Sequence, residues 1–178
     1  MRRWRRQKKD ASEPSDHALG RSHGGFSTKI HLLCDDQGHP LACHLTGGQT
    51  HEAAALVELL VHADETVVDE HGRRVAWPRK LAGDKGYRAA WIDELLLKLG
   101  ITPVIPSKKD ESPKARRQRG IPFDRNAYRQ RNVIERLVGR LKECRRILTR
   151  FEKTARNYHA MLTLAFIRYY LMLGAKAF

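Results

Sequence analysis

The sequence has few cysteines and no long apolar run. Its most apolar segment, residues 157–173, is interrupted by a histidine and an arginine and is too short to cross a membrane. No apolar stretch follows the basic residues 1–9, so this start is not a secretory signal. Three scattered cysteines suit a reducing cytosol, since they form neither a disulfide framework nor a zinc ribbon: Cys34, Cys43 and Cys144. These absences exclude a disulfide-rich secreted domain and indicate no membrane role.

Acidic residues are also scarce. The 178 residues include 34 Lys and Arg against 20 Asp and Glu, which gives a formal net charge of +14 and a pI near 10.1. Such an excess of positive charge indicates a polyanionic partner, and nucleic acid is the leading candidate. A solubilising basic surface would have the same composition, so the charge predicts the partner and not the activity.

The first part of the chain is predicted to contain an arm, a hairpin and a helix. Residues 1–25 are basic and then rich in Ser, Gly, Asp and Pro, without a hydrophobic period, so we interpret them as a mobile basic arm. Residues 26–33 and 40–46 alternate apolar and polar side chains on either side of an Asp-Asp-Gln-Gly turn, which is typical of a β-hairpin. Thr50 is the predicted N-cap of a helix that extends through His62 and packs on this hairpin.

A strand, a helix and a second strand follow. Residues 79–84 and 102–105 are short apolar strand candidates, and the amphipathic segment 89–99 between them is typical of a helix ended by Gly100. This order predicts a parallel β-α-β unit. Asp84 falls at the carboxyl end of the first strand, where α/β sheets carry their functional residues.

Several residues of this region have predicted structural roles. The aromatic rings of Trp77 and Trp91 are expected to be buried against the sheet, because large aromatic side chains dominate protein cores. Asp93 lies in the first turn of the predicted helix, where a carboxylate interacts favourably with the helix dipole. For Asp93 and its neighbour Glu94 we therefore prefer this structural role over metal binding.

The remaining residues predict a loop and a pair of helices. Residues 107–124 contain two prolines, a glycine and a dense run of basic side chains, so we interpret them as a basic loop. Apolar residues at helical spacing predict one long helix over 126–149 and a second over 155–175. The sequence contains no internal repeat and no low-complexity tract.

Four polar residues share one stripe of the first of these helices. Tyr128, Arg131, Glu135 and Lys142 fall within a narrow sector of the helical wheel, at the margin of the apolar face. Arg131 and Glu135 alone would be an ordinary i, i+4 ion pair, worth about 0.2–0.5 kcal/mol on an exposed helix. The complete spacing Y-x2-R-x3-E-x6-K is much more specific than any pair within it.

This spacing resembles the signature of the DDE transposases of bacterial insertion sequences, specifically the fifth insertion-sequence family. Two further segments resemble blocks of the same family: the glycine-rich stretch and strand over residues 20–31, and residues 81–87 (LAGDKGY), which are similar to the block with the second catalytic Asp. The resemblance implies an α/β fold of the RNase H-like type. It consists of a mixed sheet flanked by helices, without its first strand and with a long C-terminal helical pair, over residues 26–178.

The resemblance also implies the roles of individual residues. Asp84 and Glu135 correspond to the second and third catalytic carboxylates, which hold Mg2+ or Mn2+ in a two-metal site once the first Asp is supplied. Two such ions about 3.5–4 Å apart activate the attacking oxygen and stabilise the leaving oxygen of a phosphodiester, and hard cations prefer oxygen ligands. Tyr128, Arg131 and Lys142 correspond to supporting residues that contact the active site or the DNA backbone.

One expected residue has no counterpart. In the family the first catalytic Asp lies on a strand upstream of the glycine-rich stretch. Asp10 and Asp16 precede that stretch here, but no β-forming residues surround them, so neither is expected to replace the first Asp. The prediction is therefore a truncated transposase that is inactive alone.

Two functions remain open on these residues. The first is a transposase domain that catalyses metal-dependent cleavage and strand transfer of double-stranded DNA, at transposon ends and target. The second is a catalytically dead fragment that binds DNA or full-length transposase. In both cases we expect a homo-oligomer or a complex with full-length transposase, in the bacterial cytoplasm at the nucleoid. In both, the basic loop is predicted to contact DNA phosphates through Lys108, Lys109, Arg116, Arg117 and Arg119.

Overall fold

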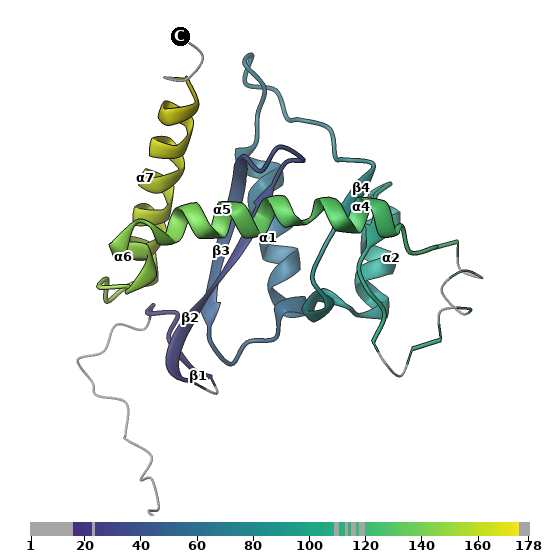
Figure 1. Cartoon of the computed structure of the whole chain (residues 1–178), viewed down its shortest axis with the longest axis horizontal. Coiled ribbons are helices and arrows are strands. Elements are labelled where there is room, and N and C mark those ends of the chain that lie inside the picture. Colours follow the sequence, from purple (N-terminus) through teal and green to yellow (C-terminus); the bar gives the residue numbers. More distant parts are fainter. Residues whose placement is uncertain are drawn as a thin grey trace, which may run out of the picture.

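The computed structural model describes residues 16–22, 24–108, 111–112, 114, 117 and 120–174, which form an α/β fold (Figure 1). None of the helices in this part of the chain has both the length and the apolarity needed to cross a membrane. The elements follow in the order β1 (Gly20–Ser22), β2 (Gly25–Cys34), β3 (Pro40–Gly47), α1 (Glu52–Thr66), β4 (Lys80–Ala82), η1 (Lys85–Tyr87), α2 (Ala90–Lys98), β5 (Thr102–Val104), α4 (Arg125–Gln130), α5 (Asn132–Lys142), α6 (Arg145–Leu148) and α7 (Ala155–Gly174).

The predicted hairpin is confirmed. Strands β2 and β3 pair antiparallel from Thr28↔Gly47 to Cys34↔Pro40. Asp35 closes the turn, because its Oδ1 accepts hydrogen bonds from the backbone N–H groups of Gln37 and His39. Strand β1 also pairs with β2 and lies within residues 1–25, so the sheet begins inside the segment that we interpreted as an arm.

The two faces of this hairpin are covered by different helices. Side chains alternate between the faces along a strand, and Ile30 and Leu32 of β2 pack with Leu137 and Leu141 of α5. Leu33 points to the opposite face and packs against buried residues of α1. Helix α7 contributes Leu162 to the first of these two clusters. The hairpin is therefore a layer between α1 on one side and the C-terminal helices on the other (Figure 1).

Helix α1 differs from its predicted bounds at both ends. Its N-cap is His51, whose ring accepts a hydrogen bond from the N–H of Ala53, whereas the backbone carbonyl of Thr50 accepts one from Lys29 Nζ. The helix continues past His62 to Thr66, which keeps Ala63 buried beneath the hairpin. The predicted N-cap at Thr50 and the predicted end at His62 are therefore wrong.

The predicted β-α-β unit is confirmed. Strands β4 and β5 are parallel, with Leu81 opposite Pro103, and η1 and α2 connect them. Fully buried residues of α2 and of the segment directly after β5, Ile92, Leu96 and Ile105, pack with Leu56 and Leu60 of α1. Helix α1 therefore contacts both the hairpin and the β-α-β unit, and it joins the two halves of the molecule.

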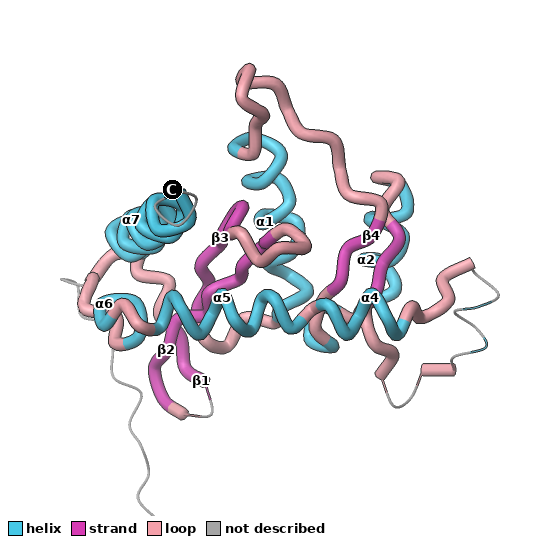
Figure 2. Tube along the Cα trace, turned by 45° about the horizontal axis from the view of Figure 1, so that its top comes forward, coloured by secondary structure: helices cyan, strands magenta, loops and turns pink. Residues whose placement is uncertain are grey.

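The long predicted helix over 126–149 is interrupted twice. Helices α4 and α5 meet at Arg131, where the backbone stays helical, and together they form a rod that crosses the front of the molecule (Figures 1 and 2). The second interruption is complete, because Cys144 is extended and precedes the short helix α6. This break turns Ile147 into the core, where its carbonyl accepts a hydrogen bond from the hydroxyl of Tyr158 on α7. Helix α7 begins at the predicted residue.

The RNase H-like α/β class is confirmed, with one difference in the sheet. The described strands form two groups, β1–β2–β3 and β4–β5, rather than one continuous mixed sheet. Within the described ranges, no strand pairs with the edge of residues 28–34 opposite β3, and none pairs with the second edge of β4. The two groups therefore present unpaired strand edges.

Candidate active site

A cleft of about 970 Å³ lies between the two groups of strands. Ile30 and Leu32 of β2 line it on one side, and Leu81 of β4 and Val104 of β5 line it on the other. The α4–α5 rod borders the cleft and contributes Ile134 and Val138 together with the polar residues described below. The interior of the cleft is therefore apolar, whereas charged groups lie along its border.

Asp84 lies on this cleft at the carboxyl end of β4. Strand β4 ends two residues earlier, and the N–H of Gly83 donates to the carbonyl of Val104, which continues the parallel register toward Asp84. The side chain of Asp84 caps η1 by accepting a hydrogen bond from the N–H of Lys85 at 2.6 Å. Asp84 is exposed, so its carboxylate is accessible from the cleft.

Glu135 lines the same cleft from α5. Its Oε1 lies 2.7 Å from a guanidinium nitrogen of Arg131, and its side chain is 64% exposed. The guanidinium carbon of Arg131 lies 5.4 Å from the centre of the Tyr128 ring, and Arg131 Nε is buried without a hydrogen-bond partner. Tyr128, Arg131 and Glu135 are thus in contact along one stripe, as their spacing predicts.

The other supporting residues are distributed more widely. Lys142 lines the cleft at the end of α5, whereas Tyr128 supports Arg131 from outside the cleft lining. Lys108 and Arg117 are exposed in the basic loop, away from the cleft lining. Three other predicted DNA contacts lie outside the described residues: Lys109, Arg116 and Arg119.

The donor set of the cleft fits a hard cation only in part. Asp84 and Glu135 supply carboxylate oxygens, which are the ligands that Mg2+ and Mn2+ prefer. However, no group of three or more His, Cys, Asp or Glu side chains suited to a metal occurs among the described residues. Asp16 does not add a third ligand, since it is absent from the cleft lining and its carbonyl accepts a hydrogen bond from Ala155. Asp35, Asp36 and Asp64 also line the cleft, but within the described ranges they form no metal-binding group of three or more with Asp84 and Glu135.

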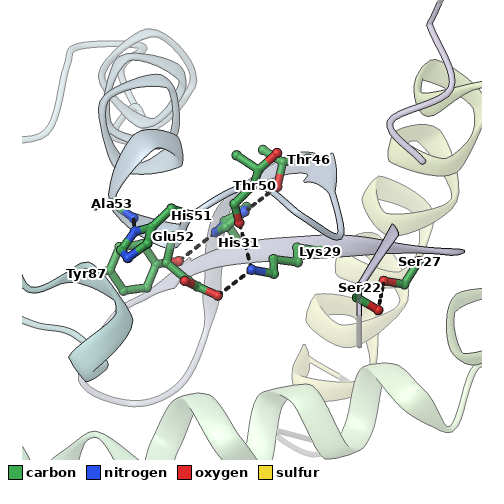
Figure 3. Close-up of polar contacts among 10 residues, drawn as sticks. All are labelled: Ser22, Ser27, Lys29, His31, Thr46, Thr50, His51, Glu52, Ala53 and Tyr87. Carbon is green, nitrogen blue, oxygen red and sulfur yellow. Dashed lines mark hydrogen bonds and ion pairs between the residues drawn. The ribbon is translucent and has the colours of Figure 1, made fainter. Parts of the chain in front are cut away.

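A buried polar network connects the block around Asp84 to the hairpin. His31 of β2 is only 3% exposed, and its two ring nitrogens lie 2.8 Å from the hydroxyls of Tyr87 and Thr46 (Figure 3). Beside it, Lys29 forms an ion pair with Glu52 at 2.7 Å. Tyr87 ends the η1 turn that Asp84 caps, so this network fixes the turn against β2. Sequence reasoning missed it, because a lone histidine in a strand carries no specific signal.

Burial makes His31 sensitive to acid. Desolvation lowers the pKa of His31 to about 4, with further contributions from His44 and Lys29 that outweigh the opposing effect of Glu52. Burial also raises the pKa of Tyr87 to about 12. At neutral pH both groups are uncharged, which suits a neutral imidazole that donates through one nitrogen and accepts through the other.

His31 should therefore contribute to acid unfolding. Because its pKa in the folded chain lies below the ordinary value of 6.5, protonation favours the unfolded chain, and stability is lost as the pH falls from 6.5 toward 4. The shift corresponds to about 3 kcal/mol. Urea unfolding at several pH values should show that the free energy of unfolding falls less between pH 6.5 and pH 4 in His31→Gln than in the wild type. An identical pH dependence in the two proteins would contradict the prediction.

A family model and a bacterial relative both match most of this chain. A family model described as a transposase DDE domain matches residues 2–170. A Burkholderia cepacia protein assigned as a transposase for insertion sequence element IS402 is 30% identical over 163 residues, which cover 92% of this chain and 68% of that protein. No solved structure matches the chain significantly. Because the family model covers nearly the whole sequence and includes both Asp84 and Glu135, the chain belongs to the DDE transposases of insertion sequences.

Proposed function

We propose that this chain supplies the second and third carboxylates of a metal-dependent DNA-cleavage and strand-transfer site. The observation that carries the proposal is the position of Asp84 and Glu135 on one cleft, although they come from different elements. Asp84 follows a parallel strand and Glu135 projects from the rod that crosses in front of it. The family acts on DNA, and the basic composition of the chain fits such a substrate.

The acidic and basic residues that resemble the family signature have proposed roles. Asp84 and Glu135 would hold Mg2+ or Mn2+, which when bound lowers the pKa of the attacking water and stabilises the leaving oxygen. Arg131 holds the Glu135 carboxylate by its ion pair and is itself supported by the Tyr128 ring. Lys142 places a positive charge at the same cleft, where it would bind a phosphate of the DNA backbone.

We propose that the third carboxylate comes from a preceding strand that this chain lacks. Unpaired edges of β2 and β4 border the same apolar cleft, and a strand inserted there would satisfy the backbone groups of both. The relative from Burkholderia cepacia extends beyond the matched region, since the match covers 68% of it. In this proposal the chain is the C-terminal portion of a transposase of the fifth insertion-sequence family, and it needs the added strand to cleave DNA.

The complete enzyme would act on transposon ends and target DNA in the bacterial cytoplasm, as a homo-oligomer. A second function follows from the incomplete donor set. Because no three-ligand group occurs among the described residues, the isolated chain would bind DNA or full-length transposase without cleaving it. Both functions would use the basic residues of the loop over 107–124, so they differ in DNA cleavage and not in DNA binding.

A nicking experiment separates the two functions. This chain would be compared with a completed chain, in which it is preceded by the segment of the Burkholderia cepacia relative that lies upstream of the residue aligned with Gly20. We expect the completed chain to nick supercoiled plasmid in Mg2+ or Mn2+, while this chain binds the plasmid without nicking it. Nicking by this chain at the same rate would refute the truncation. Failure of both proteins to nick, with DNA binding retained, would favour the binding function.

A further inference from the structure

The most deeply buried ion pair of the described residues lies outside the cleft. Arg88 directly follows η1 and precedes α2, and its side chain is 3% exposed. One guanidinium nitrogen lies 2.7 Å from the carboxylate of Asp93, which is 1% exposed. The same nitrogen also donates to the backbone carbonyl of Ala89. Asp93 therefore holds Arg88 in a fixed orientation from behind, and it lies in the first turn of α2 as predicted.

The opposite side of Arg88 faces the basic loop. Its Nε donates to Glu111 Oε2 at 2.6 Å, and a terminal nitrogen contacts Glu111 Oε1, so the pair is bidentate. Glu111 is 19% exposed and belongs to the segment 107–124. The hydrogen bond with Glu111 is also the largest contribution that raises the pKa of Arg88. A bidentate pair between planar groups fixes direction as well as distance.

Glu111 is an exception in charge, because most of the charged residues around it in the loop are basic. Between residues 107 and 120 the sequence has six basic residues and two acidic ones, Asp110 and Glu111. A segment of this charge is repelled by a chain that carries a net charge of +14. An acidic side chain within the loop that reaches a buried arginine overcomes this repulsion at one defined point.

We propose that Arg88 is a positioning residue that anchors the basic loop through Glu111 and thereby presents the basic side chains of the loop to DNA. Arg88 lies four residues after Asp84, and both belong to the segment that connects β4 to α2. The pair between Arg88 and Glu111, which we call the anchor, therefore attaches the loop to the segment that carries a proposed catalytic carboxylate. This inference rests on the proposed contact between the loop and DNA. It goes further by assigning the placement of the loop to a residue that touches no DNA.

The Glu111→Gln variant tests the anchor, because charge and position predict opposite results. The substitution removes one negative charge, and simple electrostatics would strengthen DNA binding. If the anchor positions the loop, affinity for a fluorescein-labelled duplex of arbitrary sequence should instead fall about threefold or more. The slope of the logarithm of the binding constant against the logarithm of the salt concentration should become shallower by about 0.9 for each DNA phosphate that the loop no longer neutralises. Trypsin should cleave the loop about tenfold faster, since the hydrogen bonds between two charged groups no longer hold it.

Asp69→Asn is the matched control. Asp69 also pairs with an arginine, Arg73 at 2.8 Å, but that arginine is 72% exposed and no basic loop is attached. The control makes the same change in charge and should bind DNA as tightly as the wild type or more tightly. Arg88→Lys should behave like Glu111→Gln, because lysine keeps the charge but cannot form the bidentate pair. Circular dichroism would verify that the variants are folded.

The outcomes separate this inference from the proposed function. A fivefold variant, in which Lys108, Lys109, Arg116, Arg117 and Arg119 are all replaced by glutamine, measures whether the loop contacts DNA at all. If this variant binds weakly while Glu111→Gln binds like Asp69→Asn, the anchor is wrong and the DNA contact stands. If the fivefold variant binds like the wild type, the loop does not contact DNA, and both the anchor and the DNA contact are overturned. Unchanged trypsin cleavage in Glu111→Gln would also overturn the anchor.

Discussion

The Glu135→Gln substitution is expected to lower Mg2+-dependent nicking by the completed chain at least about a hundredfold, with little change in DNA affinity. Glutamine has nearly the same shape but lacks the negative charge that makes a carboxylate a strong ligand of a hard cation. The side chain is 64% exposed, so neither burial nor core packing depends on it. The loss should appear in the rate of nicking at saturating DNA, measured on supercoiled plasmid.

The matched control for this substitution is Glu143→Gln. Glu143 is exposed at the C-cap of the same helix and does not line the cleft. Its substitution makes the same change in charge and should leave nicking within about twofold of the wild type. Equal losses in the two variants would show that net charge controls the rate, and the role of Glu135 as a ligand would be wrong. Unimpaired nicking by Glu135→Gln would contradict it directly.

The largest effect on stability is expected from Leu162→Ala. Leu162 is fully buried on α7 and packs with Cys43 of β3, Leu137 of α5 and Ile147 of α6. Truncation would remove apolar contacts and leave a cavity at the point where these elements meet. Substitutions of this kind cost about 3–4 kcal/mol, which is a large part of the stability of a typical domain. Urea denaturation would measure the change in the free energy of unfolding.

Leu164→Ala provides the comparison within the same helix. Leu164 is 56% exposed, so its truncation removes little buried surface and should change the free energy of unfolding by no more than about 0.5 kcal/mol. Both substitutions replace leucine by a stronger helix former, and any effect of helix propensity is therefore shared. Similar losses in the two variants would mean that α7 is not packed through Leu162.

Local patterns were sufficient to predict the hairpin and the β-α-β unit. Alternating side chains in β2 and β3 and the turn at Asp35 specify their pairing within a few residues. The apolar segment of α2, ended by Gly100 with its positive φ of 74°, likewise specifies its own end. These elements depend on contacts that are close in sequence, and a single sequence contains that information.

Features set by distant contacts could not be predicted in the same way. Helical periodicity continues through Cys144, but the helix ends there because Ile147 is buried in the core and its carbonyl accepts a hydrogen bond from the Tyr158 hydroxyl. Trp91 was expected to be buried and is 44% exposed, since α2 places Ile92 and not Trp91 on its inner face. Trp77 does pack, partly buried, against the core residues of α1.

In the candidate site, too, contacts between residues close in sequence could be predicted, whereas contacts between distant residues could not. The spacing of Tyr128, Arg131 and Glu135 predicts their contacts, because they are neighbours on consecutive helical segments. The approach of Asp84 to the same cleft followed only from family resemblance. The contact between Arg88 and Glu111 could not be predicted, because no local pattern indicates that a residue more than twenty positions away reaches Arg88.

The unpaired strand edges beside the apolar cleft also affect how the chain behaves at high concentration. An edge with free N–H and C=O groups can pair with the edge of another molecule, and this geometry promotes aggregation. The repulsion between chains of net charge +14 opposes such pairing, but salt or nucleic acid screens that repulsion. Solubility of the isolated chain should therefore be greatest in dilute, low-salt solution free of nucleic acid.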